Sequence, residues 1–176
     1  MTELLRTIHG SAHDIPLPDG SVQCIVTSPP YWGLRRYAGE QGVEWPAVDY
    51  APMPGLPTLH VDAMRCELGL EPTPEAYIGH MVLCLREWRR VLRDDGVAFV
   101  NLGDSYANST AAGNKVFGNP DFNGTRPSRA ATLTASKVIP PGLKPKDMVG
   151  IPWRLAFAAQ ADGWWLRSDI IWAKPN

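Results

Sequence analysis

The sequence lacks the features that mark membrane proteins, secreted proteins and zinc-binding domains. No stretch approaches the roughly 18 apolar residues of a membrane span, and the first residues, MTELLRTIHG, have neither the basic nor the apolar region of a signal peptide. The three cysteines, Cys24, Cys66 and Cys84, form no C-x-x-C pair. Neither a zinc site nor a disulfide framework is therefore predicted. We expect a cytoplasmic protein with no membrane partner and no bound metal.

A strong net charge is also missing. The chain carries 17 basic and 18 acidic residues, a formal net charge of −1, so no overall field attracts it to nucleic acid. Any contact with DNA phosphates would have to be local. Its 176 residues, 44% of them hydrophobic, are typical of one soluble globular domain, and we predict a single domain over residues 1–176.

The order of apolar runs predicts alternating strands and helices. Four short β-prone runs are expected to be strands: residues 4–9, 22–27, 97–102 (as a buried strand) and 165–174. One helix is expected from Pro74, capped by Thr73, to a stop at residues 94–96. A second is expected from a cap at Asp147 to about Ala161. This alternation favours an α/β fold in which helices cover a sheet.

Two stretches interrupt the alternation and are predicted to be irregular. Residues 38–72 are rich in proline and glycine and lean acidic. Residues 107–146 are dominated by small and polar residues, and one acid, Asp121, stands there against six basic residues: Lys115, Arg126, Arg129, Lys137, Lys144 and Lys146. Such local charge suits loops that contact DNA phosphates, and it suits a solvated surface loop equally well.

Two consecutive prolines follow the predicted strand at 22–27. They stop the pairing of the strand and stiffen the backbone, as at the start of any rigid loop. Ligands of α/β sheets bind beyond the carboxyl ends of strands. There, Ser28 and the carbonyl of Pro29 could accept the hydrogens of an exocyclic amino group, while Tyr31 could stack on a flipped base.

The full string, TSPPYW (27–32), resembles the catalytic motif of the N4-cytosine and N6-adenine DNA methyltransferases. Further segments resemble the same family: LEPTPE (70–75), RVLRDDG (90–96), NLGDSY (101–106), GIPWR (150–154), DGWWLR (162–167) and IIWAKPN (170–176). The resemblance implies a Rossmann-like methyltransferase sheet with helices on its faces. It also implies S-adenosylmethionine as cofactor and duplex DNA with a flipped target base as substrate.

The resemblance also assigns roles to individual residues. The catalytic residues would be Ser28, Pro29, Pro30 and Tyr31. Asp104 would line the cofactor or base pocket, with capping of the next turn as its alternative role. DNA or base contacts would come from Trp32, Arg126, Arg129, Lys137 and Lys174, although Lys174 also suits an exposed strand end. Cys24, Trp88, Trp153, Trp164 and Trp172 are expected to serve packing.

Part of the family pattern is missing. The cofactor motif F-x-G-x-G does not occur, and the nearest string, FNGTR (122–126), lacks its second glycine. Relatives often read His-Gly-Asp where this chain has HGS (9–11). The motif would be expected downstream of Asn176, so we expect the amino-terminal part of a longer enzyme, the product of a split gene, or a remnant. A C-terminal partner chain or second subunit could complete this partial domain, because its sheet would otherwise expose an apolar edge.

Several functions stay open. Serine before Pro-Pro favours N4 of cytosine over N6 of adenine as the target, and the lack of any Pro-Cys pair argues against cytosine C5 methylation, which needs a thiolate. The chain could instead be an inactive DNA-binding fragment or one half of a split methyltransferase. A methyltransferase of RNA or of protein amides is a further alternative.

Overall fold

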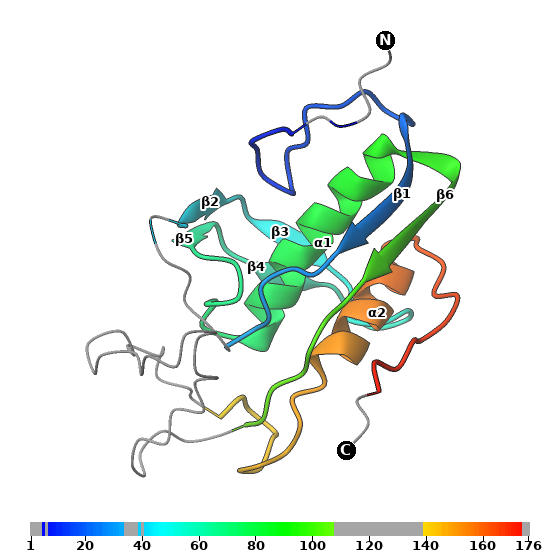
Figure 1. Ribbon diagram of the computed structural model, residues 1–176. Coiled ribbons are helices and arrows are strands. Elements are labelled where there is room, and N and C mark those ends of the chain that lie inside the picture. Colours follow the sequence, from blue (N-terminus) through cyan, green and yellow to red (C-terminus); the bar gives the residue numbers. More distant parts are fainter. Residues whose placement is uncertain (1–4, 6, 34–38, 40, 108–138, 174–176) are drawn as a thin grey trace, which may run out of the picture.

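The computed structural model describes residues 5, 7–33, 39, 41–107 and 139–173. In chain order its elements are β1 (Val22–Thr27), β2 (Val43–Trp45), β3 (Val48–Tyr50), β4 (Leu59–Val61), β5 (Met64–Cys66), α1 (Pro74–Val91), β6 (Leu92–Val100) and α2 (Ile151–Ala161). The fold is therefore mixed α/β, as predicted. The long helix α1 runs through the middle of the molecule, with β1 and β6 along one side and the short strands β2–β5 along the other (Figure 1).

Helix α1 begins where the sequence predicts. The Thr73 Oγ1 accepts the backbone N–H of Ala76 at 3.1 Å, Pro74 takes the first helical position, and Arg89 and Arg90 lie in the last turn, where positive charge suits the helix dipole. The helix ends at Val91. The predicted stop at residues 94–96 is therefore wrong, because these residues already belong to β6.

Strands β1 and β6 pair in parallel. Val22 lies opposite Leu92 but Cys24 lies opposite Val97, so residues 93–96 bulge out of the pairing. Gly96 makes this bulge possible, because a Cβ there would lie 2.9 Å from the Arg93 carbonyl oxygen. Residues 94–96, whose composition is typical of a turn, thus form part of a bulge within β6.

One face of this parallel pair is open. Side chains alternate between the faces of a strand. Ile25 and Val100 pack against the core, whereas Val26 is 79% exposed and Val97 and Phe99 are each 48% exposed. Cys24 is exposed too. The predictions of a buried strand at 97–102 and of a core position for Cys24 are therefore wrong.

Residues 38–72 contribute to the core, contrary to the prediction of an irregular surface stretch. β2 pairs antiparallel with β5, and β3 with β4. Their side chains Trp45, Val48, Tyr50 and Val61 are buried against α1. The close approach depends on Gly79 of α1, where a Cβ would lie 3.0 Å from Val48.

Helix α2 packs against α1 and starts later than predicted, at Ile151. Asp147 does not cap it; its carboxylate accepts the N–H of Lys144 at 2.8 Å and closes a turn. Ion pairs connect α1 with α2 and with the residue that follows it, among them Arg86 with Asp162 at 2.7 Å and Arg154 with Glu75 at 3.0 Å. Trp153 and Phe157 share a face of α2 as predicted, with ring centroids 6.0 Å apart.

Two predicted strands are not found. Residues 5 and 7–9, and residues 165–173, have no regular secondary structure. Ile170, Ile171 and Trp172 are each at least 75% exposed, so the apolar run predicted as a strand has no neighbour to pair with among the described residues. Trp153 and Trp172 are likewise exposed, whereas Trp88 is buried as expected.

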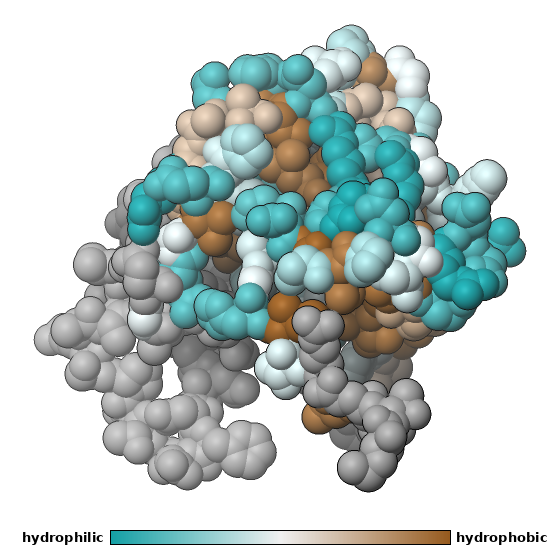
Figure 2. Space-filling model, turned by 90° about the horizontal axis from the view of Figure 1, so that it is seen from above, coloured by the Kyte–Doolittle hydropathy of each residue, from teal (hydrophilic) through white to brown (hydrophobic). Residues whose placement is uncertain are grey.

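Hydrophobic side chains reach the surface in several places between hydrophilic ones (Figure 2). Within the described part of the chain, neither helix is both long and apolar enough to cross a membrane. A single hydrophobic cluster joins α1, α2 and the short strands. The extent of the domain over residues 1–176 stays a prediction.

Candidate functional site

The Pro-Pro loop, residues 28–32, leaves the carboxyl end of β1. The chain leaves the carboxyl end of β6 at the same edge, because the N–H of Asn101 donates to the Thr27 carbonyl at 2.8 Å. This edge of a parallel pair is where α/β proteins bind ligands. The two predicted motifs at 27–32 and 101–106 are therefore brought together.

Ser28 and Tyr31 face each other within the loop. The Ser28 Oγ lies 3.3 Å from the Tyr31 hydroxyl, and Ser28 is exposed while Tyr31 is half-buried. Gly103 makes room for the tyrosine ring, because a Cβ at that position would lie 2.8 Å from two ring carbons. At the edge of the sheet the loop thus presents the hydroxyls of Ser28 and Tyr31, and the Tyr31 ring packs against Gly103.

Three hydrogen bonds connect the loop and the residue after it to α1 and to residues 69–71. Tyr77 of α1 donates its hydroxyl to the Pro30 carbonyl at 2.9 Å. The indole N–H of Trp32 donates to the Glu71 carbonyl at 3.0 Å, and the N–H of Gly33 donates to the Gly69 carbonyl at 2.7 Å. Burial raises the pKa of Tyr77, which keeps the phenol protonated as a donor.

Trp32 lies inside the protein. Its side chain is buried, with 6% exposed, and its N–H is engaged. The contact of Trp32 with a DNA base stays a prediction that this burial does not favour. The other predicted DNA contacts, Arg126, Arg129, Lys137 and Lys174, lie outside the described residues.

Asp104 serves the start of α2. Its carboxylate accepts the N–H of Ser105 at 2.8 Å and those of Gly150 and Ile151 at 3.0 Å. A negative charge at this end complements the helix dipole. Asp104 therefore caps α2, a helix that begins 47 residues later, and not only the turn that follows it in sequence. The cofactor role of Asp104 stays a prediction.

The thiols of the partly buried Cys66 and the buried Cys84 are poorly suited to act as nucleophiles. Burial, followed by the nearby Glu71, raises the pKa of both Cys66 and Cys84 to about 12. A thiol, not a thiolate, is then present at neutral pH.

Cys66, Glu71 and His80 also form the one cluster among the described residues with the composition and spacing of metal ligands.

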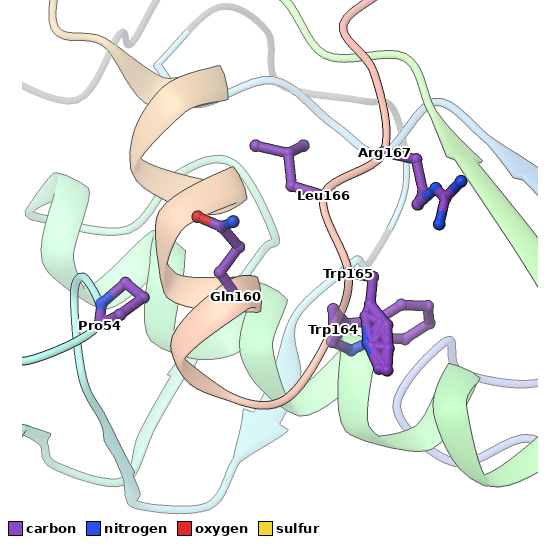
Figure 3. A pocket seen from close by; sticks show the side chains of 6 residues that line it. All are labelled: Pro54, Gln160, Trp164, Trp165, Leu166 and Arg167. Carbon is purple, nitrogen blue, oxygen red and sulfur yellow. The ribbon is translucent and has the colours of Figure 1, made fainter.

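An open pocket of about 590 Å³ lies beside α2. It is lined by Pro54, by Gln160 of α2 and by four consecutive residues that follow the helix, Trp164, Trp165, Leu166 and Arg167 (Figure 3). No residue of the Pro-Pro loop takes part in it. We therefore place the candidate site at the loop and not at this pocket.

Sequence reasoning missed three residues of the site. Tyr77 is part of the helical repeat of apolar residues, so its pattern indicates only a core position. Gly103 and Glu71 lie inside segments that resemble the family, but nothing in the sequence says what they contact. Their roles depend on packing between segments far apart in the chain, which a linear pattern does not contain.

A family model described as DNA methylase matches residues 22–176. The chain is 44% identical over 160 residues to the Type II methyltransferases M.Cfr9I of Citrobacter freundii and M.XycI of Xanthomonas campestris pv. cyanopsidis, and 42% identical over 153 residues to M.SmaI of Serratia marcescens. These alignments cover 91%, 91% and 87% of the chain, but only 42%, 42% and 41% of the relatives. No solved structure matches the chain.

Proposed function

Because the chain belongs to the DNA methylase family, whose model covers residues 22–176, we propose that it holds the target base for transfer of a methyl group to an exocyclic amino group of DNA. The observation that carries this proposal is the Pro-Pro loop at the carboxyl end of β1. There, the exposed Ser28 hydroxyl lies 3.3 Å from the Tyr31 hydroxyl on a loop anchored by Tyr77.

The loop supplies positioning. The nitrogen lone pair of an amino group on a base is conjugated with the ring, so it is a poor nucleophile until the group is held and oriented. Ser28 Oγ and the Pro29 carbonyl accept the two amino hydrogens, which directs the lone pair toward the incoming methyl carbon. Tyr31 stacks on the flipped base. Transfer is then direct, without a covalent enzyme intermediate, and correct placement supplies much of the rate.

The family implies S-adenosylmethionine, whose sulfonium carries the transferable methyl group. The F-x-G-x-G motif with which the family contacts this cofactor does not occur in the sequence. Asp104, the residue predicted for the cofactor, is occupied by three backbone N–H groups. We therefore assign the main cofactor contacts to a complementary polypeptide.

The open face of the parallel pair supports the proposal that a complementary polypeptide contacts the cofactor. Val26, Val97 and Phe99 expose apolar surface, and β1 has a neighbour on one side only among the described strands. Such an edge invites pairing with another segment. Since the chain spans about two fifths of the length of these relatives, we propose that a C-terminal partner chain or second subunit covers this face.

The proposal also covers target and setting. N4 of cytosine is favoured over N6 of adenine because serine precedes the two prolines. Arg126, Arg129, Lys137 and Lys174 are proposed to contact DNA phosphates. The names of the relatives, Type II methyltransferases, support a role in restriction and modification, in the cytoplasm.

The test is methyl transfer from tritiated S-adenosylmethionine to duplex DNA. The chain is assayed alone and with the carboxyl-terminal part of the Citrobacter freundii relative, which extends beyond the aligned 42%. We expect incorporation in the mixture and a loss on the order of 100-fold for Tyr31→Ala, because misplacing a reacting group has that size of effect. Leu56→Ala, at a residue that is 50% exposed between β3 and β4 and away from the loop, is the control.

Equal incorporation by Tyr31→Ala and the unchanged chain would contradict the assignment of the loop. DNA binding without any transfer in the mixture would favour the second candidate, an inactive DNA-binding fragment. Transfer to RNA or to protein that duplex DNA does not compete with would favour the third.

A further inference from the structure

The pair formed by Glu71 and His80 is fully buried. Glu71 is 3% exposed and His80 is 0% exposed, and the Glu71 Oε1 lies 3.0 Å from the His80 Nδ1. Glutamate is almost never fully buried unless it is paired, and burying such a pair contributes little net stability compared with apolar residues of similar size. The pair therefore calls for a role beyond stability.

Glu71 connects directly to the back of the Pro-Pro loop. Its Oε2 accepts the N–H of Gly69 at 2.8 Å, and the Gly69 carbonyl in turn accepts the N–H of Gly33 at 2.7 Å. Its own carbonyl accepts the indole N–H of Trp32 at 3.0 Å. One buried residue thus fixes the chain at the end of the loop through two separate routes.

Gly69 touches the loop itself. Its φ is +91°, and a Cβ there would lie 3.0 Å from the Tyr31 carbonyl oxygen and 3.2 Å from Pro30. A side chain at this position would press on the loop unless the turn or the loop shifts. We therefore expect a movement of Gly69 to reach Pro30 and Tyr31.

His80 holds the other oxygen of Glu71 in place. Its ring stacks on Trp45 with centroids 4.4 Å apart and 8° between the planes. It lies on α1 three positions after Tyr77, which binds the Pro30 carbonyl. The same helix therefore anchors the loop directly through Tyr77 and indirectly through His80 and Glu71.

We propose that Glu71, oriented by His80, is a positioning residue that sets the placement of Ser28 and Tyr31 through Gly69 and Trp32. This rests on the proposed function of the Pro-Pro loop. Cys66 completes a metal-like trio with its Sγ 4.0 Å from the His80 Nδ1. We favour the hydrogen-bonded pair because both oxygens of Glu71 already accept hydrogens, from His80 and from Gly69.

The first readout does not depend on methyl transfer. In protein labelled with fluorotyrosine, the resonance of Tyr31, identified by its loss in Tyr31→Phe, should shift or broaden in Glu71→Gln. It should stay in place in Glu87→Gln, which weakens a different charged pair of the same helix, Glu87 with Arg90. In the complemented enzyme, Glu71→Gln should lower kcat by about 10-fold or more with little change in the KM for S-adenosylmethionine.

A second pair of variants covers the case in which Glu71→Gln does not fold. Gly69→Ala and Gly55→Ala both place alanine at positive φ, +91° and +83°, but nothing lies within 4 Å of a Cβ at Gly55. Only Gly69→Ala should move the Tyr31 resonance and lower kcat.

Several outcomes would overturn the proposal: an unmoved Tyr31 resonance in both Glu71→Gln and Gly69→Ala, equal effects in the matched controls, or one equivalent of tightly bound zinc in the purified chain. If the Tyr31 resonance shifts in Glu71→Gln but the unchanged protein transfers no methyl group, the positioning role of Glu71 is supported and the proposed function is wrong.

Discussion

Tyr77 connects the interior of α1 to the loop that carries the proposed chemistry. Its side chain is fully buried, and its hydroxyl donates to the Pro30 carbonyl at 2.9 Å. Tyr50 has an equivalent contact elsewhere: it is buried, and its hydroxyl donates to the Glu75 carbonyl at 2.9 Å. A comparison of variants at the two tyrosines therefore distinguishes the effect of a buried hydrogen bond on stability from its effect on the placement of the loop.

We predict that Tyr77→Phe and Tyr50→Phe each lower the free energy of unfolding by about 0.5–1.5 kcal/mol, because each removes one buried hydrogen bond. Only Tyr77→Phe should also reduce methyl transfer, because only its carbonyl partner belongs to the Pro-Pro loop. Urea unfolding and the tritium assay measure the two effects. Equal transfer by both variants would show that Tyr77 has no part in placing the loop.

Single residues were predictable where their chemistry is local. Two prolines after an apolar strand indicate a rigid loop whatever surrounds them, and the loop lies at the predicted end of β1. Trp32 was expected to contact a base, yet its ring packs into the hydrophobic core, where its N–H donates to the Glu71 carbonyl. Partners 39 residues apart in sequence leave no trace in a linear pattern.

At the scale of elements, Glu87 and Arg90 connect α1 to the chain before β1. The Glu87 carboxylate accepts the N–H of Ile15 at 2.8 Å and two N–H groups of Arg90 at 2.6 and 2.9 Å. Arg90 also donates to the carbonyls of Ile15 and Leu17. Hydrogen bonding to Arg90 lowers the pKa of Glu87 below its ordinary value of 4.5.

This shift predicts a dependence of stability on pH. Because the pKa is lower in the folded state, Glu87 contributes stability above its unfolded pKa and loses it as the pH falls through the folded pKa. The difference in urea midpoint between the unchanged chain and Glu87→Gln should therefore be largest near neutral pH and shrink below about pH 4.5. A difference that stays constant down to pH 3 would contradict this. Asp169→Asn, in the exposed segment after α2, is the control.

Elements with local signals were predicted well and the others were not. Thr73 and Pro74 mark the start of α1, and an apolar run marks β1. The strands β2–β5 have three residues each within a stretch rich in proline and glycine, too short for a periodic signal. Residues 165–173 have the composition of a strand, but a strand also needs a neighbour, and composition does not supply one.

At the scale of the whole molecule, the α/β class is confirmed and the extent of the sheet is not. β1 and β6 form a parallel pair along one side of α1, and the remaining strands form separate antiparallel pairs. The sequence predicted an exposed apolar edge of the sheet, but not the exposed apolar face of the parallel pair. Which segments fold over a face depends on contacts between distant parts of the chain.

We predict that Phe99→Lys weakens association with the complementary polypeptide while reducing self-association of the chain alone. Phe99 is 48% exposed on the open face, and burying a lysine charge there is costly. Leu56→Lys, at a residue 50% exposed between β3 and β4, is the matched control and should change neither. Sedimentation velocity measures both equilibria. Equal behaviour of the two variants would place the partner on another surface.

The most direct test of the central claim is the identity of the methylated nucleoside. Duplex DNA treated with S-adenosylmethionine, the chain and the complementary polypeptide is digested to nucleosides and analysed by mass spectrometry. We expect N4-methylcytosine, formed by the unchanged chain and lost in Tyr31→Ala. N6-methyladenine would keep the amino-group site and overturn the preference for cytosine, whereas 5-methylcytosine, or DNA without any methylated base, would contradict the claim that residues 28–31 hold an exocyclic amino group for transfer.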